Sequence, residues 1–317
     1  MPASSPAKVS VVIPCFNDGA YLAESVGSVL AQQGGFELCE VLVVDDGSDD
    51  PQTLEALTEI AKHPKVITAP NEEQKGPGGA RNTGVRRATG DWIVFLDSDD
   101  ILCDGSIDAR LRAAAGFPGS RWVGGDFIIL NEDGILESET FFRSRPQPRR
   151  VVNAAFETGA PILLSRPVRE FIENPPTNMC CTMAKKDLIE AVGGFDPTQR
   201  LQQDFHLFIR MAYYADFVFV PQPVMHYRLH SGNSTRSSLN TLRWRETACR
   251  KLLADATFAT YAAALKRKIS EVNREISVEL AVSGSQWSSM QAALRSLVAC
   301  PENMAGWKRL AASLVFR

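Results

Sequence analysis

The sequence lacks several features that would place it in other classes of protein. No apolar run in its 317 residues is long enough to cross a bilayer, and its first residues, MPASSPAK, lack the apolar region of a signal peptide. Its seven cysteines show no zinc-ligand spacing, and the chain has no long low-complexity tract or clear internal repeat. We therefore expect a cytoplasmic globular protein whose cysteines are reduced and structural.

Glycine-rich nucleotide motifs are also missing from the place where they would be expected. The first predicted strand, residues 9–13, is followed by PCFNDGAY, which holds neither G-x-G-x-x-G nor a glycine-rich loop bearing Lys or Arg. These absences argue against a dehydrogenase and a nucleotidyl transferase. Hydrophobic residues make up 44% and charged residues 22% of the chain, as in an ordinary globular protein with one large core, or a catalytic domain with an appendage.

Acidic residues follow two predicted strands, at the point where each strand ends. Residues 40–44 are followed by Asp45 and Asp46, and residues 93–96 are followed by the run DSDD at 97–100. Carboxylates crowded at the end of a hydrophobic strand repel one another, so a bound cation would explain them. Oxygen ligands of this kind suit Mg²⁺ or Mn²⁺.

The alternative for the acids at 97–100 is that they cap the next helix. Asp104 is already placed to cap the helix predicted over 105–115, which leaves the upstream acids unexplained. Predicted strands and helices alternate up to this point, which indicates an α/β fold with a mostly parallel sheet and helices on both faces. Such sheets bind ligands at the carboxyl ends of their strands, where both acidic runs lie.

Beyond residue 117 the predicted elements are irregularly spaced. They are a strand over 122–130, a turn over 131–134, a basic loop over 143–150 that prolines keep out of regular structure, a helix over 181–192, a helix over 201–214, and a short strand over 217–220 that leads into the loop HYRLHSGNSTRSS. The basic loop is either solvated or in contact with an anionic group of the substrate.

The segment 239–317 changes in composition. It holds 12 Lys and Arg against 6 Asp and Glu, although the net charge of the whole chain is −3. Its periodicity predicts amphipathic helices, which have two possible uses. They could lie on an anionic membrane, or pack on the catalytic part or a second subunit with Trp287 and Trp307 as buried anchors. We expect packing, because aromatic residues at helical spacing are usually buried.

Seven stretches of the chain, in order, resemble the family-2 glycosyltransferases, which have the GT-A fold. They are VSVVIPCFND, VLVVDDGSDD, GPGGARNTGV, DWIVFLDSDD, GGFDP, LQQDFHLFIRM and HYRLHSGNSTRSS. The resemblance implies a GT-A catalytic domain over 1–238 and leaves 239–317 as a helical appendage. It also implies inverting, metal-dependent transfer of a sugar from a nucleotide sugar, which we expect to be a UDP-sugar, to a carbohydrate or lipid-linked acceptor.

The resemblance assigns roles to individual residues on the donor side. Pro14, Phe16 and Asn17 match the end of the first strand, which packs around the nucleotide base. Asp46 matches the acid that accepts a hydrogen bond from uracil. Arg81 matches a basic residue that meets the base or the phosphates.

The remaining roles concern the metal, the phosphates and the proton transfer. Asp97 and Asp99 match the two acids of the D-x-D motif, with Ser98 between them on the donor-binding loop. The first acid belongs to the ribose and metal region, and the second ligates the Mn²⁺ or Mg²⁺ held by the diphosphate. Asp204 matches the general base that takes the proton of the acceptor hydroxyl. His230 matches a region that closes on the diphosphate.

Some of these assignments have alternatives. Asp204 could instead be a first-turn acid that favours the helix dipole, and Gln203 stands before it where the family often has Glu. His230 could simply hydrogen-bond its own loop. Residues 240–244, NTLRW, keep the Arg-Trp but lack the Gln of the Q-x-x-R-W motif of processive members, so we expect one sugar to be added per encounter.

The competing function is a non-catalytic scaffold that binds nucleotides or carbohydrates and retains the fold. The joint presence of Asp97, Asp99 and Asp204 argues against it. We expect no nucleic-acid partner, and a homodimer is left open. Neither the donor sugar nor the acceptor can be read from the residues, although we expect the acceptor site on the irregular segment 141–182.

Overall fold

A mixed nine-stranded sheet forms the centre of the protein. The computed structural model describes residues 5–131, 134, 136–137, 139–230, 233 and 238–315, and among them the strand order is β3-β2-β1-β4-β8-β6-β9-β5, with β7 paired to β9. Neighbours among β3, β2, β1 and β4 are parallel, as are β6 and β9, while β8 is antiparallel to both of its neighbours. The strands are β1 (Ala7–Cys15), β2 (Phe36–Asp45), β3 (Val66–Pro70), β4 (Trp92–Phe95), β5 (Ile101–Leu102), β6 (Trp122–Leu130), β7 (Ile162–Leu164), β8 (Met183–Lys185) and β9 (Phe217–Arg228).

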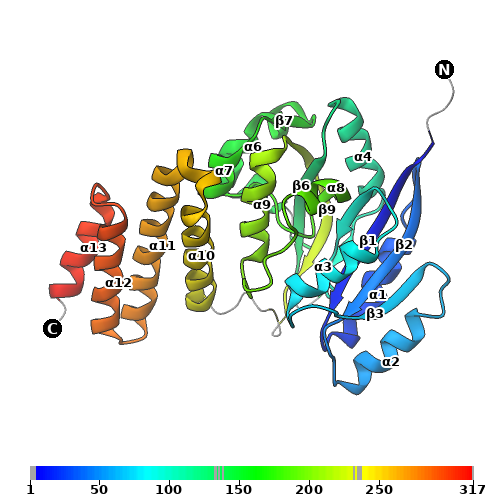
Figure 1. The fold of residues 1–317 in the computed structure, drawn as a ribbon, viewed down its shortest axis with the longest axis horizontal. Coiled ribbons are helices and arrows are strands. Elements are labelled where there is room, and N and C mark those ends of the chain that lie inside the picture. Colours follow the sequence, from blue (N-terminus) through cyan, green and yellow to red (C-terminus); the bar gives the residue numbers. More distant parts are fainter. Residues whose placement is uncertain are drawn as a thin grey trace.

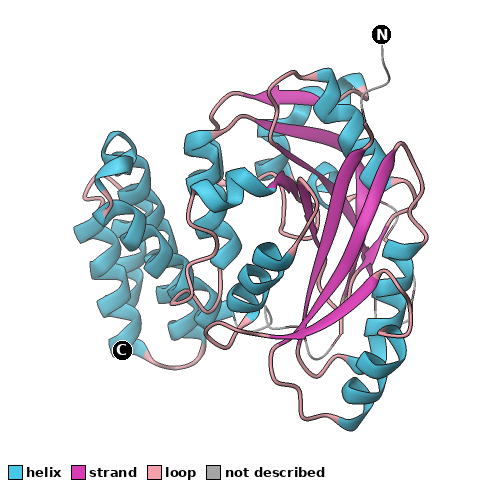
Figure 2. Ribbon diagram, turned by 45° about the vertical axis from the view of Figure 1, so that its right-hand side comes forward, coloured by secondary structure: helices cyan, strands magenta, loops and turns pink. Residues whose placement is uncertain are grey.

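The N-terminal part is the predicted alternation of strands and helices (Figure 1). Its helices are α1 (Gly19–Leu30), α2 (Pro51–Ile60), α3 (Pro77–Arg87) and α4 (Ser106–Gly116). The central strands β1 and β4 are buried on both faces, because helices cover the sheet on either side (Figure 2). In the parallel register Cys15 pairs with Asp45, so the carboxyl ends of β1 and β2 lie at the same edge of the sheet.

The prediction of a basic loop over 143–150 is wrong. The chain there forms two helices, α5 (Phe141–Ser144) and α6 (Pro146–Thr158). Pro146 stands at the start of α6, where a missing backbone N–H leaves no hydrogen bond unmade and the fixed φ suits the helix. The prolines therefore begin a helix instead of preventing one.

Other boundaries also differ from the prediction. Residues 181–192 hold the short strand β8 before the helix α8 (Lys186–Ala191), and β9 continues eight residues beyond Val220 to Arg228. Asp104 does not cap α4, whose N-cap is Gly105 in the left-handed conformation, without a side-chain cap bond. The remaining helices of this part are α7 (Val168–Glu173) and α9 (Gln203–Tyr214). The turn at 131–134 and the loop after β9 lie partly outside the described residues.

The C-terminal segment forms helices that stand beside one another at one end of the molecule (Figures 1 and 2). They are α10 (Ser238–Ala254), the 3₁₀ helix η2 (Ala256–Tyr261), α11 (Ala262–Val282), α12 (Gln286–Ala299) and α13 (Met304–Val315). α11 buries Ile269, Val272, Ile276 and Leu280 on the predicted apolar face. None of the described helices is long and apolar enough to cross a membrane.

The expectation that Trp287 and Trp307 are buried against the catalytic part is wrong. Trp287 is 68% exposed and Trp307 is 51% exposed, and their helices α12 and α13 are the outermost ones (Figure 1). Burial against a second subunit stays a prediction. The apolar side chains of Val282 and Val298 are even more exposed, at 83% and 77%.

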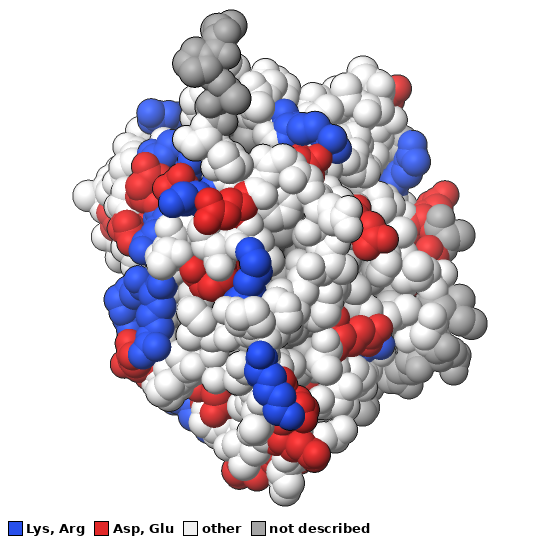
Figure 3. Space-filling model, turned by 90° about the vertical axis from the view of Figure 1, so that its right-hand side faces the viewer, with Lys and Arg blue, Asp and Glu red and all other residues white. Residues whose placement is uncertain are grey.

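At the opposite end of the molecule, beyond β2 and α2, Lys and Arg are interspersed with Asp and Glu (Figure 3). This face shows no broad basic patch of the kind that binds nucleic acid.

Candidate active site

A cavity of about 710 Å³ opens at the carboxyl ends of β1, β2 and β4. Of the ten residues assigned to the site from the sequence, the structure brings nine to its wall: Pro14, Phe16, Asp46, Arg81, Asp97, Ser98, Asp99, Asp204 and His230. They come from segments as far apart as β1 and the end of β9. Parallel strands that end at one edge, with β9 and α9 beside them, explain this convergence.

Asn17 is the predicted site residue that does not line the cavity. Its side-chain oxygen accepts the backbone N–H groups of Asp49 and Asp50 at 3.0 and 3.2 Å, and its amide donates to the carboxylate of Asp49. Asn17 adopts φ 56°, in the left-handed region that Asn tolerates. Its visible role is therefore to join the end of β1 to the loop after β2.

Asp46 is held in place by the loop that precedes α3. Its carboxylate accepts the side-chain amide of Asn71 at 2.6 Å and the backbone N–H of Gly76 at 2.8 Å. Phe16, directly after the end of β1, is 43% exposed, and the Lys75 ammonium lies 4.2 Å from its ring centroid. An acid and an exposed aromatic ring thus form a surface that suits a flat, hydrogen-bonding group.

Arg81 is a buried guanidinium on the wall of the cavity, only 3% exposed. The close packing of α3 on β1 brings it there: a Cβ on Gly84 would lie 2.3 Å from a methyl group of Val12. One nitrogen of Arg81 donates to Asp97 at 2.5 Å, but Nε and Nη1 have no hydrogen-bond partner among the described residues. Buried donors are almost always paired, so these two mark a position for an acceptor that the protein itself does not supply.

Asp99 and His230 contact each other across the cavity. Nε2 of His230 lies 2.8 Å from the Asp99 carboxylate, which also accepts the side-chain amide of Asn233 at 3.3 Å. Burial and the charge of Asp97 raise the pKa of Asp99. His230 therefore reaches the D-x-D loop, and its ring packs 5.0 Å from that of Tyr21.

Asp100 lies directly behind this loop and is fully buried. One oxygen accepts the backbone N–H of Arg228 at 3.0 Å. Burial, together with the charges of Asp99 and Asp97, raises the pKa of Asp100 well above its usual value, and this outweighs the hydrogen bonds from the Arg228 N–H and the Cys180 thiol. A proton or a nearby cation would stabilise a carboxyl group buried in this way.

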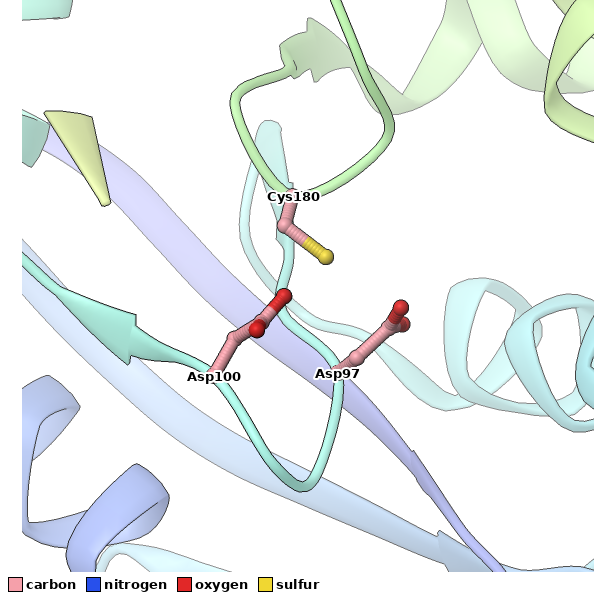
Figure 4. A group of neighbouring side chains, drawn as sticks. All are labelled: Asp97, Asp100 and Cys180. Atoms are coloured by element: carbon pink, nitrogen blue, oxygen red, sulfur yellow. The ribbon is translucent and has the colours of Figure 1, made fainter. Parts of the chain in front are cut away.

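The oxygen-rich loop fits a divalent cation, whereas the neighbouring thiol does not. Ligand atoms of Asp97, Asp100 and Cys180 lie within 4.8 Å of one another (Figure 4). Burial and the nearby charges of Asp97 and Asp100 raise the pKa of the Cys180 thiol well above its usual value, and a protonated soft ligand is poorly suited to Mg²⁺ or Mn²⁺. Carboxylates facing the cavity at Asp97 and Asp99 are the better ligands, because such ions are commonly held by one or two carboxylates and the phosphates of the substrate.

Asp18 also lines the cavity, although the sequence did not single it out. It accepts the hydroxyl of Ser98 at 2.6 Å, and burial raises its pKa. The available signal was its position three residues after the end of β1, in the same FND run as Phe16 and Asn17. Ser98 thus joins the end of β1 to the acidic loop after β4.

The opposite wall of the cavity comes from the irregular part of the chain. It includes Phe127, Phe141, Arg145, Asn178 and Met179. The rings of Phe127 and Phe141 stack at 4.4 Å, and the Arg145 guanidinium lies 3.5 Å from the centre of the Phe141 ring. Phe141, Arg145, Asn178 and Met179 come from the segment 141–182, where we expected the acceptor site, whereas Phe127 precedes it.

Asp204 stands in the first turn of α9, facing the cavity and otherwise surrounded by protein. Burial raises its pKa, and this effect outweighs the hydrogen bond from the Phe205 N–H and the positive charges of Arg81 and Arg245. The residue two positions earlier, Gln202, adopts φ 57°, and its side-chain oxygen accepts Nε of Arg245 at 2.7 Å. A partly desolvated carboxylate with raised pKa has the properties of a general base.

His206 lies on the same helix but does not reach the cavity. It is 7% exposed, and burial lowers its pKa to about 4. His206 is therefore a packing residue of α9.

Part of the chain is similar in sequence to known glycosyltransferases. Residues 10–157 match the model of the family described as Glycosyl transferase family 2. Over 105 residues, 33% of this chain, it is 40% identical to an uncharacterized glycosyltransferase of Rickettsia felis, of whose length it covers 17%. Over 128 residues, 40% of this chain, it is 34% identical to an Escherichia coli protein, UDP-Glc:alpha-D-GlcNAc-diphosphoundecaprenol beta-1,3-glucosyltransferase WfgD, of which it covers 49%. The chain thus spans only part of the length of these relatives.

A solved structure resembles most of the chain. The crystal structure of Staphylococcus aureus TarS 1–349 in complex with UDP-GlcNAc superposes with a TM-score of 0.65 over 96% of this chain and 89% of that one, at 16% identity. The likeness shows the fold, which is GT-A. With the match over residues 10–157, just under half of the chain, it makes the chain similar in sequence and in fold to family 2 glycosyltransferases.

Proposed function

We propose that this protein transfers a sugar, with inversion, from a UDP-sugar to a hydroxyl of an acceptor used in the synthesis of a cell-envelope glycan or polysaccharide. The observation that carries the proposal is one cavity that combines the unpartnered donors of Arg81, the carboxylates of Asp97 and Asp99, and the carboxylate of Asp204. The bound UDP-GlcNAc of the TarS structure and the UDP-Glc named for WfgD support a UDP-sugar as donor.

The donor half of the site suits a nucleoside diphosphate. Asp46 and Phe16 offer an acceptor and an aromatic surface for the base. The two free donors of Arg81 can bond to base or phosphate oxygens, and charge-assisted bonds of this kind are strong in a buried site. We propose that His230 stays near the diphosphate through its contact with Asp99.

A divalent cation belongs to this half of the site. We propose that Asp97 and Asp99 hold Mg²⁺ or Mn²⁺ together with the diphosphate. When bound, the ion offsets the negative charge that develops on the departing diphosphate.

The acceptor half supplies the proton transfer. A sugar hydroxyl is a weak nucleophile, and we propose that the carboxylate of Asp204 takes its proton as the oxygen attacks the anomeric carbon. The new bond forms on the face opposite the departing UDP, so a single displacement inverts the anomeric centre. One catalytic carboxylate is sufficient for this step, unlike the two of glycoside hydrolases.

Titration calorimetry tests the donor assignment. UDP should bind the whole chain in Mn²⁺ but bind much more weakly in EDTA, with GDP and TDP as weaker competitors. Asp99→Ala should lose the metal dependence, while the matched control Asp187→Ala, at an exposed acid on α8, should keep it. If no nucleoside diphosphate binds in the presence of metal, the proposal fails. Binding of UDP without any sugar transfer or hydrolysis from UDP-sugars would favour the non-catalytic scaffold.

We also propose that the outer C-terminal helices contact an anionic membrane surface. The exposed side chains of Val282, Trp287, Val298 and Trp307 lie on a segment with an excess of Lys and Arg. Apolar insertion together with attraction to anionic lipids is typical of surface-bound helices. The alternative partner for the same side chains is a second copy of the chain, so a homodimer in solution without liposome binding would replace this proposal.

A further inference from the structure

A second and larger cavity, of about 1100 Å³, lies where the C-terminal helices meet the part of the chain that holds the sheet. It is a cleft with α6 and α7 on one side and α11 on the other, and the start of α13 closes one end. None of the carboxylates assigned to catalysis lines it. We call it the helical cleft.

The helical cleft adjoins the catalytic cavity at two places. Arg145 lines the catalytic cavity, and the next residue, Pro146, lines the cleft. On α10, Thr241 lines the catalytic cavity, and Arg245, one turn later, lines the cleft. Arg245 also donates to Gln202, which belongs to the catalytic cavity and precedes Asp204 by two positions. The cleft therefore approaches the site from the side of Asp204.

Cationic side chains outnumber acids in the helical cleft. Its wall carries six Lys or Arg and four Glu. Three of the four acids are neutralised locally: Glu173 pairs with Arg169, Glu271 with Lys268 and Glu275 with Arg274. Among the described residues, Arg150, Arg245 and Arg267 form no ion pair, and Arg150 and Arg267 are exposed. The cleft thus keeps guanidinium groups that are available to an external anion.

The shape and polarity of the cleft limit what it can hold. Along α11 the lining residues recur every three or four positions from Ala264 to Glu275, which corresponds to a length of about 16 Å at 1.5 Å per residue. Its charged walls do not suit an acyl or isoprenyl chain, whose burial requires apolar surroundings. The planar guanidinium of Arg donates two parallel hydrogen bonds to phosphate oxygens. A single diphosphate would contact only a small part of such a length.

We propose that the helical cleft binds an acceptor that carries several phosphate groups in a row and leads its terminal sugar or polyol hydroxyl to Asp204. This inference rests on the proposed glycosyl transfer and adds the chemical class of the acceptor. Phosphate groups could come from a phosphodiester polymer or from the diphosphate of a lipid carrier. The length of the cleft favours the polymer.

Binding of a synthetic glycerol phosphate oligomer to the whole chain tests the proposal. Because Arg150 and Arg267 lie outside the catalytic cavity, the double variant Arg150→Gln/Arg267→Gln should bind UDP as the native chain does. Its affinity for the oligomer should fall by about fivefold or more at low salt, and the loss should shrink as salt is added. The control Lys62→Gln/Arg112→Gln removes two exposed cations outside the cleft and should leave oligomer binding unchanged.

A second arm distinguishes the source of the phosphates. If the acceptor is a polymer, the double variant should bind a short-chain isoprenyl diphosphate about as well as the native chain does. A loss of binding confined to this probe would assign the cleft to a lipid diphosphate. If native chain binds UDP but neither probe, or if the double variant and its control bind both probes equally, the helical cleft is not a phosphate site. Loss of UDP binding by the native chain would instead refute the proposed function.

Discussion

Asp204→Asn is the substitution that separates catalysis from folding most clearly in this protein. The amide keeps the size of the side chain but cannot take a proton from the acceptor. Removal of a general base typically lowers the rate by about 10²- to 10⁴-fold, so we expect kcat to fall within that range. Because no hydrogen bond joins the Asp204 side chain to Arg81 or Asp97 among the described residues, the affinity for UDP should change by less than about threefold.

The same variant should be as stable as the native chain, or more stable. Burial raises the pKa of Asp204 in the folded state above its value in the unfolded chain. The folded chain therefore holds this proton to higher pH, and its stability falls as the pH rises through the window between the two pKa values. Above that window the ionised Asp204 is a constant cost to the fold, which a neutral Asn removes. Below the window, Asp204 is protonated in both the folded and the unfolded chain, so the native chain and Asp204→Asn should differ little in stability.

The assay combines initial rates of UDP release, calorimetry with UDP, and thermal unfolding at neutral and acidic pH. The exposed Glu190→Gln on α8 serves as the control and should be active. A variant that keeps kcat within about tenfold of the native value would refute the assignment of Asp204 as the base. A large fall in the melting temperature would refute the reasoning about its buried charge.

Three further predictions follow from the contacts around the two cavities. Arg81→Gln should weaken UDP binding by about 10- to 100-fold, as expected for lost bonds to a charged ligand, whereas Arg86→Gln on the same helix should bind normally; equal affinities would contradict the role of the unpartnered donors. Because the charge of Arg245 lowers the pKa of Asp204, Arg245→Gln should raise that pKa and shift the acidic limb of the kcat/KM profile to higher pH. An acidic limb that does not move would contradict the assignment of this limb to Asp204. The intact chain should float with anionic liposomes at low salt, and Trp287→Ser should float less; a chain that stays in the soluble fraction would exclude membrane contact.

Much of the N-terminal sheet could be predicted because its signals are local. Apolar runs, acids at strand ends and helical spacing all occur within short windows, and β1 to β4 follow them. The prediction failed where a short-range rule was overridden. Pro146 was treated as a helix breaker although it begins α6, and residues 183–185 were taken as helix because a three-residue strand, β8, is fixed only by its neighbours β4 and β6.

The residues that line the cavity could be predicted better than the contacts among them. Strand-end acids and the resemblance led to nine residues that line it. No sequence rule shows that Asn17 turns to the loop after β2, that Asp99 meets His230 from 131 positions away, or that Asp100 is fully buried behind the acidic loop. These depend on how distant loops pack. For the same reason the exposure of Trp287 could not be seen from a helical period that is equally typical of a buried face.

The position of α10 has a consequence for how this protein can change. Thr241 and Arg245 show that the helix after residue 238 forms part of the wall of both cavities, so the expected boundary near residue 238 runs along the proposed acceptor side of the site. The residues proposed to bind the base and the metal lie before residue 100. If these roles hold, an exchange of the C-terminal helices between related chains would alter which acceptor is used while the donor is retained, and recombination near residue 238 would be a direct route to new glycan linkages.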